Sequence, residues 1–196
     1  MPIWPGMAAQ LSFLPEGTTP APPGLALAIE AIPPETETAL ADRIDALPLE
    51  PFRFGQWTGK RLTCSFGSGY DYARGRVLEA PPMSEWLLPV RRRLAEAFGR
   101  DADGFVQALA IRYDPGAGIG WHRDRPQYGE IIGLSLSHPA VLRLRRRVGT
   151  GFERRSIELP PRSAYLLAGE VRDGWEHSIA PIEATRRSIT FRTMRG

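Results

Sequence analysis

The chain has a single cysteine, Cys64, among its 196 residues, which excludes both an intramolecular disulfide and a cysteine-based metal cluster. No apolar run approaches the ~20 residues that a membrane-spanning helix requires. The first residues, 1–6, lack the basic start and apolar stretch of a secretory signal peptide. These absences together favour a protein of the reduced cytoplasm, with no membrane as a partner.

Lysine is nearly absent, since Lys60 is the only one and all other basic side chains are arginine or histidine. The arginines cluster within 91–93, 143–147, 154–155 and 186–187, although the formal net charge is only +3. Arginine forms bidentate contacts with phosphate, which makes nucleic acid a reasonable partner. On charge alone, a solvated arginine-rich surface is at least as good an explanation.

Length and composition fit one domain that is large enough to bury a core. Residues 1–34 are rich in proline and glycine and are expected to form an irregular N-terminal arm, with a short strand at 25–29. Helices are predicted at 35–47 and 84–98, where apolar residues recur at helical spacing. Between them, glycine-spaced aromatic and basic pieces at 52–80 predict short strands and hairpins.

The chain after Gly104 reads as strands separated by turns. Eight short strands with no long helix between them are typical of a jelly-roll, or double-stranded β-helix. We therefore predict an α+β fold in which residues 35–104, helices and a lid region, buttress a β core at 105–196 within the same domain. The expected strands are 105–113, 119–123, 130–137, 140–146, 155–159, 163–168, 174–179 and 187–193.

A His-x-Asp sequence follows the Pro/Gly turn at 114–118. Residues two apart in an extended chain point to the same face, so His122 and Asp124 can reach one point. A second histidine would complete two imidazoles and one carboxylate, an arrangement typical of non-haem Fe(II) oxygenases. His177 is the candidate, on an expected strand, whereas His138 lies at a turn and is weaker. Each histidine taken alone is more often structural.

The final expected strand carries an unusual polar face. Alternation places Arg186, Ser188, Thr190 and Arg192 on one side, and Arg187, Ile189 and Phe191 on the other. Guanidinium and hydroxyl groups are odd against a core, but they suit a cavity that holds a dicarboxylate. Six residues of strand span ~20 Å, so the two arginines would enter this cavity from opposite ends. The alternative is an edge strand whose polar face meets water.

Four motifs resemble those of AlkB-type Fe(II)/2-oxoglutarate-dependent dioxygenases, in the same order and at similar spacing over residues 105–195. The 61–72 region and the 84–98 helix resemble the segment that precedes the catalytic core in this family. The motifs are Arg112-Tyr113-Asp114-Pro115-Gly116-Ala117, His122-x-Asp124, Trp175-x-His177-Ser178 and Arg186-x-Ser188-Ile189-Thr190-Phe191-Arg192.

The resemblance implies a metal site and a cosubstrate site. By it, His122, Asp124 and His177 would be the catalytic Fe(II) ligands, with 2-oxoglutarate and O2 as the other cofactors. Arg186 would pair with the distal carboxylate of 2-oxoglutarate, helped by the hydroxyl of Tyr113.

Three further residues would frame the cosubstrate by the same resemblance. Arg192 would lie near the metal-chelating end of 2-oxoglutarate or near the substrate, and Ser188 and Thr190 would line the site. Ile111 and Ser188 stand where the family commonly has Asn, which removes two amide hydrogen bonds.

The implied reaction is oxidative dealkylation of N-alkylated bases in DNA or RNA, with single strands preferred. It is coupled to 2-oxoglutarate decarboxylation to succinate and CO2 and releases formaldehyde. A base must leave the duplex to reach a buried metal, so stacking partners and a basic track are needed. The substrate-binding candidates are Trp57, Lys60, Arg61, Phe66, Tyr70, Tyr72, Arg125, Arg145 and Trp175.

Three alternatives remain open at this point. The aromatic residues of 52–74 could simply pack on the helices, and Trp175 could be an ordinary core residue. The same core could serve an oxygenase that hydroxylates or demethylates a protein side chain or a small molecule, because function is set at the site mouth. A catalytically silent nucleic-acid-binding module is a third reading, which the intact ligand set argues against. We expect a monomer.

Overall fold

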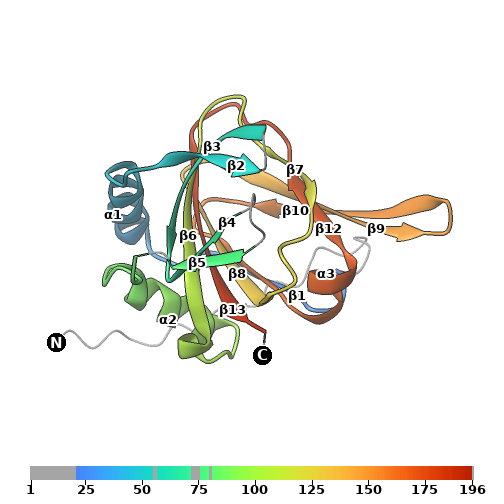
Figure 1. Ribbon diagram of the computed structural model, residues 1–196, viewed down its shortest axis with the longest axis horizontal. Coiled ribbons are helices and arrows are strands. Elements are labelled where there is room, and N and C mark those ends of the chain that lie inside the picture. The colour runs from blue at the N-terminus through green and yellow to red at the C-terminus, as the bar shows by residue number, and fades with distance from the viewer. Residues whose placement is uncertain (1–20, 55–56, 72–75, 80, 196) are drawn as a thin grey trace.

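The computed structural model describes residues 21–54, 57–71, 76–79 and 81–195. Its larger sheet has seven antiparallel strands (Figure 1), and the central β13 pairs with β8 on one side and β6 on the other. In spatial order the strands are β1 (Leu25–Ala28), β11 (Ala164–Leu167), β8 (Tyr128–Leu136), β13 (Arg186–Met194), β6 (Phe105–Tyr113), β3 (Trp57–Phe66) and β2 (Glu50–Phe54).

A second antiparallel sheet of four strands faces the first, and the two together confirm the predicted jelly-roll. In spatial order its strands are β10 (Gly151–Leu159), β9 (Ala140–Val148), β12 (Glu176–Ile179) and β7 (Ile119–His122). A separate hairpin is formed by β4 (Ser68–Asp71) and β5 (Arg76–Glu79). Apolar side chains from both sheets, among them Ile131 and Leu144, form the core between them.

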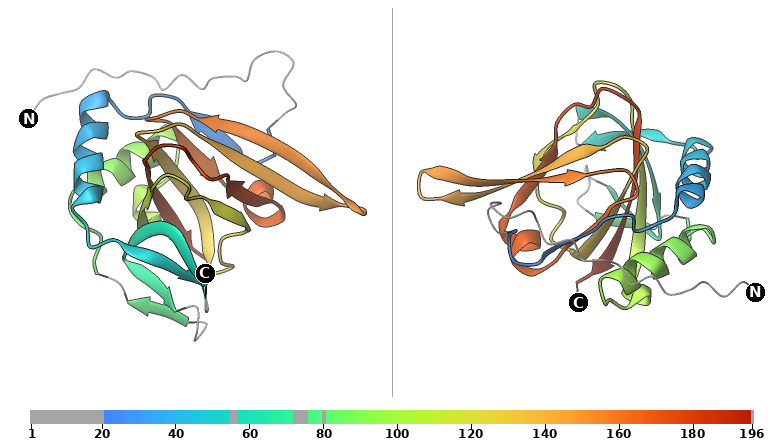
Figure 2. Two further views of the ribbon diagram at one scale, coloured as in Figure 1. Left: turned by 90° about the horizontal axis from the view of Figure 1, so that it is seen from above. Right: turned by 180° about the vertical axis from the view of Figure 1, so that it is seen from behind.

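Two helices cover the face of the larger sheet that points away from the smaller one (Figure 2). They are α1 (Pro34–Asp45) and α2 (Leu87–Ala97), close to the predicted 35–47 and 84–98. Pro34 starts α1 because it fixes φ and its missing N–H costs nothing in the first turn. Ile44 of α1 and Leu94 of α2 are fully buried against the sheet.

Strand β13 has the predicted alternation. Ile189 and Phe191 pack in the core beneath the helices, while Arg187 forms an ion pair with Asp45 of α1. The other face, with Arg186 and Arg192 at its ends, is buried against the interior between the sheets. Each buried polar group there needs a partner, because transfer from water without one costs free energy.

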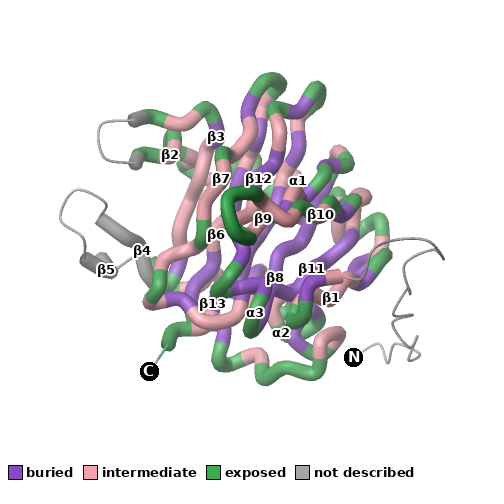
Figure 3. Tube along the Cα trace, turned by 90° about the vertical axis from the view of Figure 1, so that its right-hand side faces the viewer, coloured by how far each residue is buried: buried purple, intermediate pink, exposed green. Residues whose placement is uncertain are grey.

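The β9–β10 hairpin extends well beyond the body of the molecule (Figure 1). The pairing continues to Val148 opposite Gly151, so β10 begins four residues before the predicted 155. Residues 147–151 at its tip are exposed (Figure 3).

Two short helical segments lie outside the sequence-based expectation. A short helix, α3 (Gly169–Gly174), precedes β12 and was not predicted; a 3-10 turn spans Ala102–Gly104. The short strand predicted at 25–29 is present as β1, which pairs with β11 at the edge of the larger sheet. The division at residues 34 and 104 remains a proposal. In the described part of the chain, no helix is long and apolar enough to cross a membrane.

Candidate active site

The His-x-Asp pair and the later histidine meet at the edge of the smaller sheet. His122 ends β7, and the register places His177 of β12 directly opposite it. The two imidazole centroids are 4.2 Å apart. Asp124, two residues beyond β7, brings Oδ1 to 3.5 Å from Nε2 of His122 and to 3.7 Å from Nε2 of His177.

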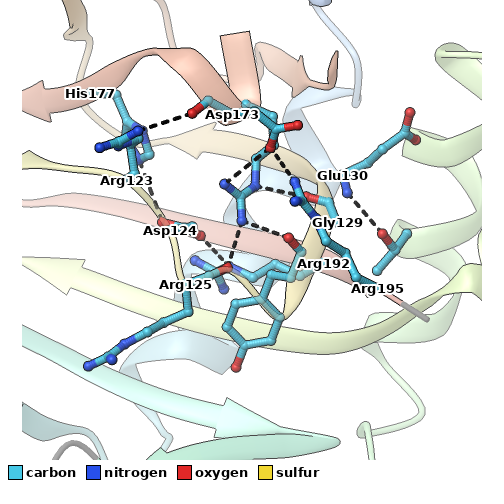
Figure 4. Close-up of polar contacts among 12 residues, drawn as sticks. Arg123, Asp124, Arg125, Gly129, Glu130, Asp173, His177, Arg192 and Arg195 are labelled. Carbon is cyan, nitrogen blue, oxygen red and sulfur yellow. Dashed lines mark hydrogen bonds and ion pairs between the residues drawn. The ribbon is translucent and has the colours of Figure 1, made fainter. Parts of the chain in front are cut away.

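Neighbouring groups orient these three side chains. The Nδ1 atom of His122 lies 2.9 Å from the carbonyl oxygen of Gly120. A proton on Nδ1 would donate to that carbonyl and leave Nε2 as a free acceptor. The Nε of Arg192 donates to Oδ2 of Asp124 at 2.6 Å (Figure 4). Its Nη1 donates to Oε1 of Gln107 at 2.8 Å. Oδ1 therefore remains the carboxylate oxygen that faces both histidines.

The protonation states suit metal binding. Burial raises the pKa of Asp124, but Arg192 and the two imidazoles outweigh it, so that pKa lies well below its usual value. Burial, followed by the proximity of His122, lowers the pKa of His177 to about 3. A metal requires an ionised carboxylate and neutral imidazoles. The three donor atoms lie within 4.8 Å of one another, so the residues present fit an Fe(II) ion.

A cavity of about 1020 Å³ opens beside the three donors. It lies between the two sheets and extends to the β2–β3 hairpin. The predicted cosubstrate residues Tyr113, Thr190 and Arg192 line it, whereas Arg186 and Ser188 are buried and are not among the described lining residues.

Arg186 has an incomplete set of partners. Its Nε and Nη2 donate to the Ser135 hydroxyl at 3.3 and 3.1 Å, and the guanidinium lies 5.2 Å from the Tyr113 ring centroid. Its Nη1 is buried without a hydrogen-bond partner, and so is Oγ1 of Thr190. Buried donors without partners are costly. Two of them on one strand face fit a carboxylate ligand such as 2-oxoglutarate.

Tyr165 is a cavity residue that the sequence reasoning missed. It is buried on β11 and lines the cavity, and burial raises the pKa of its phenol to about 12 despite the nearby Arg186. Its partner in β8 is Gly133, where an added Cβ would lie only 2.2 Å from the Tyr165 ring. The pairing of a large ring with a glycine is the signal, but it is visible only once the register is known.

Arg172 of α3 was missed as well. This buried guanidinium donates through Nη2 to the carbonyls of Arg125 and Tyr128, both at 2.7 Å, and through Nε to that of Gly129 at 2.8 Å. These hydrogen bonds hold the loop after Asp124 against α3, the helix that precedes strand β12 and His177. The neighbouring Asp173 carbonyl accepts from Arg123 at 3.2 Å, and its carboxylate contacts Arg195 (Figure 4).

The predicted substrate residues divide into groups. Arg61 and Arg125 line the cavity, and the Arg61 guanidinium stacks 3.9 Å from the centroid of the Phe52 ring. Lys60 is exposed and is not among the described lining residues. The side chains of Trp57 on β3 and Tyr70 on β4, and the whole of Tyr72, lie outside the described residues.

Phe66 is a correction. It is 4% exposed and packs edge-on against Trp86, with 6.4 Å between the ring centroids, in the core beneath the helices. Alternation along β3 turns Arg61 and Ser65 toward the cavity and Phe66 away from it. This ring therefore cannot stack on a substrate base.

Trp175 and Arg145 also lie away from the cavity lining. Trp175 is 2% exposed in the core between the sheets, and its indole donates to Glu170 at 3.2 Å, which fits the core alternative. Arg145 lies on the outer face of the smaller sheet and forms an ion pair of 2.6 Å with Glu176.

Comparison with protein families agrees with this geometry. A model of the 2OG-Fe(II) oxygenase superfamily matches residues 50–195. The chain belongs to this superfamily. It is accordingly a dioxygenase that uses Fe(II), 2-oxoglutarate and O2.

Two solved structures share this fold. The structure of OsALKBH1 superposes with a TM-score of 0.70 at 13% identity, covering 89% of this chain and 99% of that one. A Pseudomonas putida prolyl-4-hydroxylase gives 0.63 at 15% identity, covering 88% and 93%. These likenesses concern the fold, which is AlkB-like as predicted.

A relative in sequence is the uncharacterized protein L905 of Acanthamoeba polyphaga mimivirus. It is 34% identical over 101 residues, which are 45% of this chain and 48% of that protein. The chain thus matches about half the length of this relative.

Proposed function

We propose that the protein oxidatively removes alkyl groups from N-alkylated nucleobases of single-stranded DNA or RNA, as a repair activity. The size and the lining of the cavity are the main support for this proposal. At about 1020 Å³ it is at the upper end of small-ligand sites, which leaves room for a base beside the cosubstrate. Its lining combines the stacked pair of Arg61 and Phe52 with Arg125 and Trp121. The AlkB-like fold supports the same assignment.

The roles within the site follow from the contacts. His122, Asp124 and His177 would hold Fe(II), which together with 2-oxoglutarate and O2 supplies the oxidation of a substrate C–H bond. Arg192 keeps Oδ2 of Asp124 occupied, so that only Oδ1 is offered to the metal. Succinate and CO2 derive from 2-oxoglutarate, and an oxidised N-methyl group leaves as formaldehyde.

The protein's own groups would anchor the cosubstrate. Arg186 Nη1 and Thr190 Oγ1 would donate to a 2-oxoglutarate carboxylate, with the Tyr113 hydroxyl close by. Ser188 is buried behind the lining and would support Arg186. Apolar neighbours such as Leu142 exclude water from the cavity wall.

The arginine and aromatic side chains of this lining would recognise the substrate. Guanidinium groups attract phosphate and stack on bases, and aromatic rings stack on any base. We also propose Trp57, Lys60, Tyr70 and Tyr72 as substrate-binding residues. We also propose that the protein acts as a monomer in the cytoplasm.

A second candidate is hydroxylation or demethylation of a protein side chain or a small molecule. The structural likeness to a prolyl-4-hydroxylase favours it, because the same core serves both classes.

The test is incubation with Fe(II), ascorbate, 2-oxoglutarate and N-methylated single-stranded DNA or RNA. We expect formaldehyde and the unmodified base, detected by mass spectrometry, from the wild type and from His138→Ala, whose histidine lies outside the site. His122→Ala should give neither product. Succinate without base repair across several methylated strands would contradict the nucleobase assignment and favour the second candidate.

A further inference from the structure

The outer face of the smaller sheet carries guanidinium and aromatic groups in alternation. The Arg145 guanidinium lies 4.4 Å from the Trp121 ring centroid and 4.5 Å from that of Phe152. Arg143 lies 5.3 Å from Trp121. We call the whole set the outer row; it consists of Arg143, Trp121, Arg145, Phe152, Arg147 and Arg154, the last two at 5.2 and 5.4 Å from Phe152.

Strand register explains why these side chains share a face. Arg145 pairs with Arg154, and Arg147 pairs with Phe152, so the four project from the same side of the hairpin. Leu144, between Arg143 and Arg145 on β9, points the opposite way and is 1% exposed in the core. The outer row is thus the consequence of an inward apolar face on β9.

The outer row connects the active site with the projecting hairpin. Trp121 lines the cavity and directly precedes His122. From there the row passes through Arg145 to Phe152, which directly follows the exposed hairpin tip at 147–151. A strand that entered the cavity could therefore continue along this face.

The end of the outer row that is farther from the active site carries positive charge that no described carboxylate neutralises. Arg145 is neutralised by Glu176, and on the opposite face of the hairpin Arg146 and Arg155 share Glu153. Arg147 and Arg154 are exposed, and among the described residues neither has a carboxylate within ion-pair distance. Two cations flanking an aromatic ring suit an anionic polymer with planar groups.

We propose that the outer row binds the single-stranded nucleic acid that flanks the base in the cavity, an inference that rests on the proposed function. Phosphates contact Arg147 and Arg154, and bases stack on Phe152 and Trp121. The row gives affinity without base specificity, since every base has a π-face.

Binding of an unmodified strand to the metal-free protein tests this directly. The probe is fluorescein-labelled oligothymidylate of about 16 nucleotides, the upper site size of comparable single-strand binders. Anisotropy is recorded over a series of NaCl concentrations. Each phosphate contact on a single strand contributes about 0.7 to the log–log salt slope. We therefore expect the double variant R147Q/R154Q to bind at least about tenfold more weakly, with a slope lower by about 1.4.

Phe152→Ala separates stacking from charge. We expect it to weaken binding roughly tenfold, as loss of one stacking partner does, and to leave the salt slope unchanged. Arg92→Gln is the matched control, because it removes an exposed arginine from α2 on the other side of the molecule. It should bind like the wild type. Thermal unfolding monitored by circular dichroism verifies that each variant is folded.

Three results would overturn the proposal: R147Q/R154Q binding like R92Q, an unchanged salt slope in that variant, or polyglutamate binding as tightly as oligothymidylate. Failure of the proposed function would be distinguishable from failure of the outer-row proposal. If no methylated strand yields formaldehyde while the binding results hold, the outer row stands and the dealkylase assignment falls. If dealkylation proceeds and the variants bind normally, the dealkylase stands and the outer row falls.

Discussion

Arginines alternate with other residues along two strands of this protein, and the two strands use them in opposite ways. On β13 the face that holds Arg186 and Arg192 is buried between the sheets. On β9 the face that holds Arg143 and Arg147 is directed outward. Both strands alternate polar and apolar residues. The direction of the arginine face therefore depends on what covers the sheet.

The opposite directions of the two arginine faces follow from the position of helices α1 and α2. The larger sheet has α1 and α2 on its outer side, so Ile189 and Phe191 of β13 are buried beneath them and the polar face is left to the interior. In the smaller sheet, Leu142 and Leu144 of β9 point inward to the core between the sheets. Strand β13 therefore turns a polar face to the interior between the sheets, whereas β9 turns an apolar face to it.

Burial also sets the energetic demands on each group. Interior arginines must be paired, and Arg192 is, through Asp124 and Gln107. Arg186 is paired only in part, and this deficit is what points to a ligand. Exterior arginines such as Arg147 remain solvated and require no partner, so their stacking on Phe152 leaves them available to bind another molecule.

The largest predicted effect contrasts one arginine from each strand. Arg192→Met leaves the Asp124 carboxylate buried and unpaired, which should lower the free energy of unfolding of the metal-free protein by roughly 3 kcal/mol. Arg147→Met, the exposed counterpart, should change it by less than about 0.5 kcal/mol. Urea denaturation monitored by circular dichroism measures both. Equal losses in the two variants would contradict the assignment of interior and exterior faces.

A smaller effect is predicted for Arg172, which positions the metal-binding loop without contacting the donors. Arg172→Met frees the carbonyls of Arg125, Tyr128 and Gly129 and should weaken Mn(II) binding about tenfold, as loss of supporting hydrogen bonds does at other metal sites. Added guanidinium ion should restore part of the affinity. Arg123→Gln, which removes only one exposed contact in the same network, is the control. Calorimetric titration that finds unaltered affinity in Arg172→Met would refute the positioning role.

The smallest effect concerns the ion pair between Arg187 of β13 and Asp45 of α1. The hydrogen bond from Arg187 lowers the pKa of Asp45 in the folded protein, against a smaller opposing effect of burial. A depressed carboxyl pKa stabilises the fold above the unfolded value of about 3.9 and loses this contribution as pH falls through the lower folded value. The difference in Tm between the wild type and Arg187→Gln should therefore be present at neutral pH and vanish in acid. A difference that grew as pH fell would be inconsistent with this pair.

Sequence reasoning succeeds where local pattern and burial coincide. The strand predicted at 105–113 has those bounds, because β6 is a continuous run with a clear turn at each end. The alternation along β13 and the spacing of His122 and Asp124 follow from backbone geometry alone. His177 was found because few histidines compete with it.

The misses have physical reasons as well. Phe66 was placed at the substrate because the aromatic residues of 52–74 were treated as one group, whereas strand alternation turns it to the core. α3 has six residues, too few for a helical pattern, so Arg172 could not be assigned. The role of Tyr165 depends on its pairing with Gly133, and the outer row depends on contacts between strands that are remote in sequence.

The central claim is that the interior face of β13 holds 2-oxoglutarate through a guanidinium that is otherwise only partly paired. Calorimetric titration of 2-oxoglutarate into the Mn(II)-loaded protein tests this claim. The two variants to compare replace adjacent arginines whose side chains lie on opposite faces of β13. Arg186→Gln should weaken binding about ten- to hundredfold, the loss expected for a buried hydrogen bond to a charged group. Arg187→Gln should bind like the wild type. Undiminished binding in Arg186→Gln, or equal losses in both variants, would contradict the account.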